Sequence, residues 1–452
     1  MGNQDVVKKG CGFMPINEFY IRQITLKNFR GFDDRTFELA KDFTVFVGDN
    51  GKGKTSVLEG LCVALGGWVR GFMNSAKDFR NIYKNDVRSI KSVVSTKGLI
   101  KQYPVEVACL GEINGMAIEW SRELDEKGHT KTGGLKDLSE VTKKIAKKVN
   151  TATDTDVILP VIAYYSCLRA SKDRVSNTEI DSTSRVYGYS GSLLKETKYF
   201  RMLNYIQELR YEYLEDPENT QMYIMLMDAL TKIVESAAGK GSRVDFKVKH
   251  GELMLEHING ELIQFSELSD GYKGMISLVA DIFFRMAKLN PQLKQTLLLE
   301  TPGVVLIDEL DLHLHPKWQR QVVGDLKRIF PKVQFVATTH SPFIIQSLDE
   351  GELVTLDDTN LEDYAGASIE DISEEVMGIE MPQYSAHKLE MYKSAFEYFS
   401  ALDGLKQFDE AKLKDLKLDL DILSKRYGDN VAYYAFIEQK YYAKKAELEA
   451  RR

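Results

Sequence analysis

Short runs of apolar residues alternate along this chain with longer segments whose apolar positions recur at helical spacing. Residues 43–47 read FTVFV and residues 304–307 read VVLI, and both runs end in turn-forming or acidic residues. Apolar runs of this length are typical of strands that are buried on both faces of a parallel sheet. The pattern predicts an α/β protein whose functional groups lie at the carboxyl ends of its strands.

The second of these predicted strands is followed directly by Asp308 and Glu309. A helical pattern then extends over roughly residues 316–329, with a proline in the first turn, where its missing N–H does no harm. A further apolar strand, residues 333–337, leads to His340. If the two strands are neighbours, their acids and the histidine meet at one edge of the sheet. That edge is a candidate site for a metal, a water molecule and a phosphate.

Residues 48–55, GDNGKGKT, follow the first strand and have the GxxxxGK[ST] spacing of a phosphate-binding loop. Its glycines let backbone N–H groups turn toward phosphate oxygens, and the helix that follows adds the positive end of its dipole. Lys54 supplies a charge for the outer phosphates and Thr55 a hydroxyl for Mg²⁺. Asn50 fits a phosphate contact and a solvated loop position equally well. The residues predicted to bind nucleotide here are Gly48, Asn50, Gly51, Gly53, Lys54, Thr55 and Ser56.

A third segment, residues 268–271 with the sequence LSDG, opens another amphipathic helix. Ser269 is predicted to cap this helix, whose N-terminus is then a site for an anion. Taken alone, the segment also fits an ordinary capped helix. Because it lies in the sequence between the phosphate loop and the Asp308 strand, we group it with these two segments as a third part of the candidate site.

The remaining patterns predict hairpins, a helical insert and C-terminal helices. Hairpin structure is expected at residues 105–120 and 244–265, and two helices within residues 191–239 form a small insert. A long charged helical tract is expected from residue 387 to residue 427, followed by a last helix. The predicted division is residues 1–190 for the first part of a head, 191–240 for the insert, 241–360 for the second part of the head and 361–452 for a helical C-terminal domain.

Composition narrows the functional classes. The 452 residues carry a net charge of −7, with 60 basic and 67 acidic side chains, so nucleic-acid binding would need a local basic patch. Lysines at residues 143–148 could form such a patch, or only a solvated helix face. The four cysteines form no CxxC pair, which fits a reducing cytosol. No apolar run approaches the ~20 residues that span a membrane. We expect a cytoplasmic protein without a membrane partner.

Together these segments resemble the motif set of ABC-type ATPases. Residues 48–55 correspond to Walker A, residues 268–271 to the signature, and residues 304–309 to Walker B. Asp311 then falls in the D-loop, and His340 corresponds to the switch histidine. The signature departs from the family's common LSGGQ, because this chain has LSDGY.

Within this superfamily, residues 24–32, ITLKNFRGF, resemble the RecF and SMC branch rather than transporters. The segment between Walker A and the signature lacks a long heptad tract, which excludes a coiled-coil arm of SMC length. Residues 309–319, 337–348 and 374–385 are similar to the PtuA-type ATPases of Septu and related retron systems of anti-phage defence. That family works with a separate HNH nuclease. The chain itself offers no nuclease constellation, so no intrinsic DNA cleavage is expected.

The resemblance implies an ABC-ATPase head, a mixed β-sheet with a P-loop core, that carries a small helical insert and a C-terminal helical tail. It also implies ATP and Mg²⁺ as cofactors. In the implied mechanism, Lys54 holds the triphosphate, while Thr55 and Asp308 hold the metal. Glu309 orients or deprotonates the attacking water, and His340 senses the γ-phosphate.

The signature residues Ser269 and Gly271 are implied to act on the nucleotide of an opposing copy. A complete site would then need at least a head-to-head homodimer. The functions left open are an ATPase that regulates a partner nuclease, a DNA-binding repair or recombination ATPase of RecF type, and an ATP-binding scaffold. The presence of Glu309 argues against the scaffold.

Two histidines close to Walker B, His313 and His315, could be mistaken for part of a metal cluster with Asp311. We favour helix-entry roles for both histidines and a place for Asp311 at the dimer interface. The metal role remains the alternative.

Overall fold

The fold is described from a computed structural model, which covers residues 16–73, 79–91, 98–133, 135–149, 157–167, 184–194, 199–218, 221–357, 364, 367–427 and 431–451. It has two compact units, with the boundary between Ile372 and Ser373. The insert helices belong to the first unit. The finer four-part division expected from the sequence stays a prediction.

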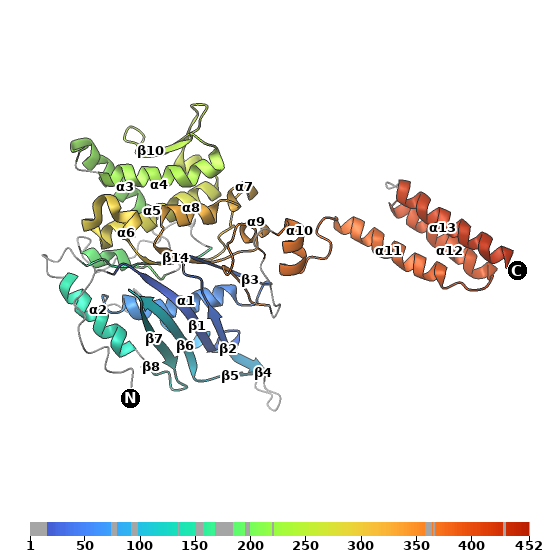
Figure 1. The fold of residues 1–452 in the computed structure, drawn as a ribbon, viewed down its shortest axis with the longest axis horizontal. Coiled ribbons are helices and arrows are strands. Elements are labelled where there is room, and N and C mark those ends of the chain that lie inside the picture. Colours follow the sequence, from blue (N-terminus) through green and yellow to red (C-terminus); the bar gives the residue numbers. More distant parts are fainter. Residues whose placement is uncertain are drawn as a thin grey trace. The chain divides into compact units, whose positions relative to one another are not determined.

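A five-stranded parallel sheet forms the centre of the first unit, in the order β15-β3-β14-β13-β9 (Figure 1). Its strands are β3 (Phe43–Val47), β9 (Val161–Tyr165), β13 (Gly303–Ile307), β14 (Val333–Thr338) and β15 (Leu353–Thr355). All residues of β3, β9, β13 and β14 are buried. This burial explains their largely apolar sequences, and the predicted neighbours β13 and β14 pair directly.

A second sheet is antiparallel, in the order β2-β1-β6-β7-β8. Its strands are β1 (Phe19–Phe29), β2 (Phe32–Glu38), β6 (Val105–Ile113), β7 (Met116–Leu124) and β8 (Thr130–Gly133). Buried and partly exposed residues alternate along β6, as expected for a sheet with one face on the core. The hairpin predicted at residues 105–120 is confirmed as β6 and β7.

The helix that follows the phosphate loop, α1 (Lys54–Val69), packs against both sheets. It contacts β1, β6 and β7 of the antiparallel sheet and β14 of the parallel sheet. Most of its residues are buried, including Trp68 near its end. The helix α1 is therefore held between the two sheets. On the other side of the parallel sheet lie α4, α5 and α8 (Figure 1).

One buried side chain joins the two sheets. Gln334 of β14 accepts a hydrogen bond from the Ile21 N–H at 2.8 Å and donates to the Ile21 carbonyl at 2.7 Å. Its amide also donates to the Ala40 carbonyl at 2.7 Å. The pairing of β1 with β6 shifts register between Ile21 and Gln23, at this same place. Gln334 thus satisfies backbone groups where β1 meets the central sheet.

The helical insert and the second set of hairpins match their predictions. The insert contains α3 (Tyr199–Glu215) and α4 (Gln221–Ala238), and α4 packs on α5 (Asp270–Leu289). The predicted hairpins at residues 244–265 form a three-stranded sheet, β10 (Arg243–Lys247), β11 (Glu252–Glu256) and β12 (Leu262–Gln264).

The single helix expected at residues 316–329 is wrong. The structure has two helices, α7 (Pro316–Gln319) and α8 (Val322–Ile329). The Gln319 amide donates to the Leu314 carbonyl at 2.9 Å, and Trp318 is buried. These contacts hold α7 against the preceding loop, and the helix is interrupted at residues 320–321 before α8 begins.

The second unit contains three helices with their own core. They are α11 (Ala386–Asp403), α12 (Glu410–Tyr427) and α13 (Val431–Ala450). Leu402, Leu413 and Tyr441 belong to this core, and the Tyr441 hydroxyl donates to the Leu413 carbonyl at 3.0 Å. The continuous helical tract expected over residues 387–427 is wrong, because the chain turns at residues 404–409. That turn lets α11 and α12 bury their leucines against each other.

The shorter elements complete the list of bounds. They are η1 (Lys84–Asp86), β4 (Ser89–Lys91), β5 (Leu99–Lys101), α2 (Leu135–Val149), η2 (Arg185–Tyr189), η3 (Phe265–Glu267), η4 (Pro291–Thr296), α6 (Leu297–Glu300), α9 (Pro342–Ile345), α10 (Ile369–Asp371) and the π-helical turn η5 (Ile372–Val376). Within the described ranges, no helix combines the length and apolar character needed to cross a membrane.

Replacing Gln334 by leucine is expected to destabilise the first unit. The change removes the partner of two buried backbone groups on Ile21 and of the partly buried Ala40 carbonyl, which lowers the free energy of unfolding by about 3 kcal/mol or more. Urea unfolding followed by circular dichroism measures the loss, with Gln207→Leu on the surface of α3 as the control. Equal stability of the Gln334→Leu protein and the wild type would contradict this role.

Candidate nucleotide-binding site

The phosphate loop lies between β3 and α1, as the sequence predicts. Gly48, Asn50, Gly51 and Gly53 are in the loop, and Lys54, Thr55 and Ser56 form the first turn of α1. Gly53 has a φ of 106°, and a Cβ atom there would lie 2.8 Å from the Phe32 ring. A side chain at this position would therefore meet both an unfavourable backbone conformation and the β1–β2 turn.

Lys54 points back over the loop that precedes it. Its ammonium donates to the Gly48 carbonyl at 2.5 Å and to the Asp49 carbonyl at 3.1 Å. The side chain is buried, and this burial lowers the pKa of Lys54 despite the opposing effect of Asp49 and Asp308. A phosphate group bound in the loop would supply a countercharge to this desolvated ammonium.

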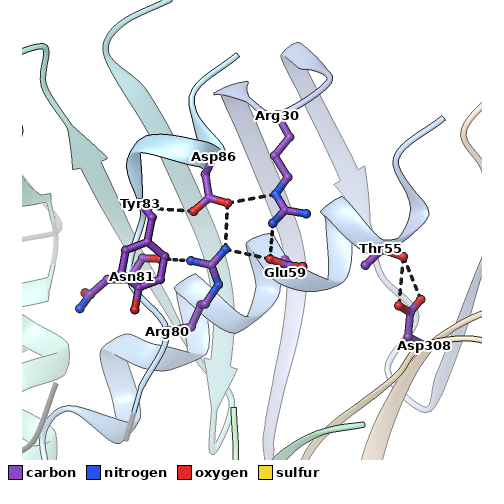
Figure 2. A network of polar contacts seen from close by, with 8 residues as sticks. All are labelled: Arg30, Thr55, Glu59, Arg80, Asn81, Tyr83, Asp86 and Asp308. Carbon is purple, nitrogen blue, oxygen red and sulfur yellow. Dashed lines mark hydrogen bonds and ion pairs between the residues drawn. The ribbon is translucent and has the colours of Figure 1, made fainter. Parts of the chain in front are cut away.

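The Walker A and Walker B residues meet directly. The Thr55 hydroxyl lies 3.0 and 3.2 Å from the two carboxylate oxygens of Asp308 (Figure 2). The Thr338 hydroxyl at the end of β14 donates to the Asp308 Oδ1 at 2.7 Å. These three contacts join α1, β13 and β14 at the carboxyl edge of the parallel sheet.

This oxygen cluster fits a magnesium ion. Asp308 is 3% exposed, and among the described residues no lysine or arginine forms an ion pair with it. A buried carboxylate of this kind ordinarily has a cation or a metal as its partner. Thr55 and Asp308 present the hard oxygen ligands that Mg²⁺ prefers.

Glu309, immediately after Asp308, has a backbone φ of 51°. Its N–H donates to the Thr338 hydroxyl at 2.8 Å, and its side chain is half-buried. Non-glycine residues in this left-handed region are uncommon and cluster at functional sites. The Thr338 hydroxyl thus contacts the Asp308 carboxylate and the Glu309 backbone N–H, and it joins the end of β14 to the end of β13.

His340 is linked to Asp311, the residue that the sequence places in the D-loop. The Thr339 hydroxyl donates to the Asp311 carboxylate at 2.5 Å, and the His340 N–H donates to the same oxygen at 3.2 Å. The imidazole of His340 is exposed. His315 caps α7, because its Nδ1 accepts from the Lys317 N–H at 3.2 Å, which agrees with its expected place at the helix entry.

The signature residues lie at the start of α5, but the predicted cap is wrong. Ser269 occupies the N-cap position, and its hydroxyl makes no capping hydrogen bond. Ser269 is exposed, whereas Gly271 is buried with its Cα facing the His313 carbonyl; a Cβ on Gly271 would lie 2.4 Å from that oxygen. Across the residues that the structure describes, no hydrogen bond joins Ser269 or Gly271 to the phosphate loop.

Sequence reasoning missed a buried ion network beside α1. Glu59, one helical turn after Thr55, bonds the guanidinium groups of Arg30 at 2.5 Å and Arg80 at 2.8 Å (Figure 2). Asp86 accepts from both arginines, at 3.0 and 2.8 Å. Burial raises the pKa of Asp86, but bonds from Arg80 and the Tyr83 N–H outweigh it, so the pKa lies below its ordinary value. The network fastens α1 to the β1–β2 turn.

Asp357, just after β15, was also missed. Its carboxylate pairs with Lys52 at 2.9 Å and accepts from the Asp49 N–H at 3.2 Å. The bond from Lys52 lowers the pKa of Asp357. An acid that contacts the loop from an edge strand gives no local sequence signal, because the two are about 300 residues apart.

Comparisons with known proteins agree with this arrangement. A family model described as "AAA domain" matches residues 23–237, and one described as "AAA domain, putative AbiEii toxin, Type IV TA system" matches residues 172–346. The chain is 24% identical to the Retron Vc95 probable ATPase of Vibrio cholerae serotype O1 biovar El Tor, over 74% of this chain and 72% of that protein.

Two further similarities involve shorter or more distant matches. The Septu protein PtuA of Bacillus thuringiensis is 33% identical over 38% of this chain and 44% of that protein. Among solved structures, an Smc head domain with an extended coiled coil, bound to the C-terminal domain of ScpA and derived from Pyrococcus furiosus, covers 75% of this chain and 93% of that chain. Its sequence identity is 15% and its TM-score is 0.43. The chain is therefore similar in sequence to AAA-domain proteins and to the retron and Septu ATPases.

Proposed function

We propose that this protein binds and hydrolyses ATP at a site shared by two copies, and that the nucleotide state of this dimer regulates a partner nuclease in anti-phage defence. The observation that carries the proposal is the contact of Thr55 with Asp308. It brings Walker A and Walker B together in one chain, while the exposed Ser269 makes no bond to that site. We place the protein in the cytoplasm, in keeping with the buried Cys109, which forms no disulfide within the described ranges.

In this proposal each residue of the site has a separate task. Lys54 and the backbone N–H groups of residues 48–53 hold the phosphates. Thr55 and Asp308 would hold Mg²⁺, which neutralises charge on the phosphate oxygens when it is bound. Glu309 orients the attacking water or accepts its proton, and the exposed His340 contacts the γ-phosphate.

In the dimer, the signature segment of one copy would complete the nucleotide site of the other copy. Ser269 and the N-terminus of α5 present a hydroxyl and a positive dipole end to an opposing copy. Gly271 packs on the His313 carbonyl, so the signature and the D-loop form one surface. A nucleotide between two such surfaces would hold the copies together until hydrolysis removes the γ-phosphate.

Glu309→Gln is expected to slow hydrolysis without abolishing nucleotide binding. The amide cannot accept a proton, so turnover should fall by about 10²–10⁴-fold. Steady-state phosphate release and light scattering with ATP should show slow turnover and an accumulated dimer. Glu350→Gln, at an exposed position outside the site, is the control. Wild-type turnover in the Glu309→Gln protein would show that another residue orients the attacking water or accepts its proton.

Two inactive variants are expected to restore activity when they are mixed. Lys54→Ala damages the phosphate loop, and Ser269→Arg blocks the signature. A mixed dimer has one site with both intact halves, so an equimolar mixture should reach roughly a quarter of wild-type turnover. Each variant alone, at the same total concentration, is the control. No recovery, in mixtures that light scattering shows to be dimeric, would mean that each chain carries a whole site.

The nuclease partner is supported by the retron and Septu relatives and by the second unit. The large apolar side chains Phe396, Leu418 and Ile422 on that unit are exposed. Expression with the neighbouring genes of its operon should yield a stoichiometric complex with an HNH-type nuclease. The purified chain alone, given Mg²⁺ or Mn²⁺, should leave DNA intact. Recovery of a homo-oligomer without a nuclease, whose binding to DNA requires ATP, would instead favour a repair ATPase of RecF type.

A further inference from the structure

A polar notch lies between α4 and α8, on elements that none of the nucleotide motifs includes. Its volume is about 330 Å³. All of its lining residues have polar or charged side chains, and three of these side chains are cationic. The lining residues are Lys232, Glu235, Ser236, Lys240, Gln321 and Arg328. A cavity of this size with several convergent polar groups is suited to a small charged group.

A buried carboxylate behind the notch fixes two of its lining residues. Asp325 is 2% exposed and accepts hydrogen bonds from the Ser236 hydroxyl and from the Arg328 Nη2. Burial raises the pKa of Asp325, although these two bonds oppose the change. The Ser236 and Arg328 side chains are thus held in place before any ligand arrives.

The remaining donors of the notch have no internal acceptor. Across the described ranges, Lys232 and Lys240 make no hydrogen bond or ion pair, and the bonds of Arg328 go to Asp325 alone. Lys327, the residue before Arg328, contrasts with them. It pairs with Asp349 at 2.8 Å and also bonds Glu352. The cations of the notch therefore remain available to an anion from outside.

The one acid that lines the notch is tied to the backbone. Glu235 accepts a hydrogen bond from the Gly241 N–H at 2.9 Å. With Asp325 included, two acids oppose three cations, and one of those acids is buried. The charge that the notch presents to solvent is positive, although the whole chain carries a net charge of −7.

The lining also limits the kind of anion. It contains no aromatic or apolar side chain on which a nucleobase could stack. Ammonium and guanidinium groups are the usual donors to phosphate oxygens, and such contacts carry no sequence information. We propose that this notch binds a backbone phosphate of a nucleic acid, independently of base sequence and apart from the ATP site.

The test uses the full chain with both lysines changed, Lys232→Gln and Lys240→Gln. Arg328 is kept because its loss would leave the buried Asp325 without its cation. Binding of a fluorescent duplex of random sequence is measured by anisotropy over a range of salt concentrations. The double variant should bind about tenfold or more weakly at low salt, and its plot of log affinity against log salt should be shallower by about 1, as expected when one phosphate contact is lost.

The matched control is Lys143→Gln with Lys144→Gln, two exposed lysines on α2. This control should bind the duplex like the wild type, and all three proteins should have the same melting temperature. Weaker binding by the α2 variant alone would move the nucleic-acid contact to α2 and overturn the proposal. A wild-type chain that binds inorganic phosphate through Lys232 and Lys240, but no duplex, would overturn the assignment to nucleic acid.

Discussion

The contact between Thr55 and Asp308 is the interaction on which the rest of the site depends. It links the first turn of α1 to the end of β13, and Thr338 extends it to β14. Each partner comes from a different element, so the contact exists only when the parallel sheet and α1 are packed together. A disturbance of that packing would displace Thr55 and Asp308, which we propose as the metal ligands. Fold stability and chemistry are therefore coupled at one edge of the sheet.

The elements around this edge restrict its movement. Gln334 ties β14 to β1, and the network of Arg30, Glu59, Arg80 and Asp86 ties α1 to the β1–β2 turn. Buried ion networks are weak evidence for stability, but breaking one leaves an uncompensated charge. We interpret this network as a positioning device for α1, because Glu59 lies one helical turn after Thr55.

Much of this arrangement was predictable from the sequence because its signals are local. The loop at residues 48–55 follows a strand and opens a helix, the run before Asp308 is apolar throughout, and the strand before His340 is mostly apolar. The helix breaks near residues 320 and 404 were missed because the helical spacing of apolar residues continues across them. Asp357 and the ion network were missed for another reason. They join segments far apart in sequence, and no periodic pattern reports such contacts.

The dependence of specific ATPase activity on protein concentration tests the shared site most directly. Hydrolysis by the full chain is measured from well below to well above the concentration at which light scattering detects a dimer. A site built from two copies predicts that turnover per chain is near zero for monomers and rises with the dimer fraction. Turnover per chain that stays constant down to purely monomeric protein would contradict it.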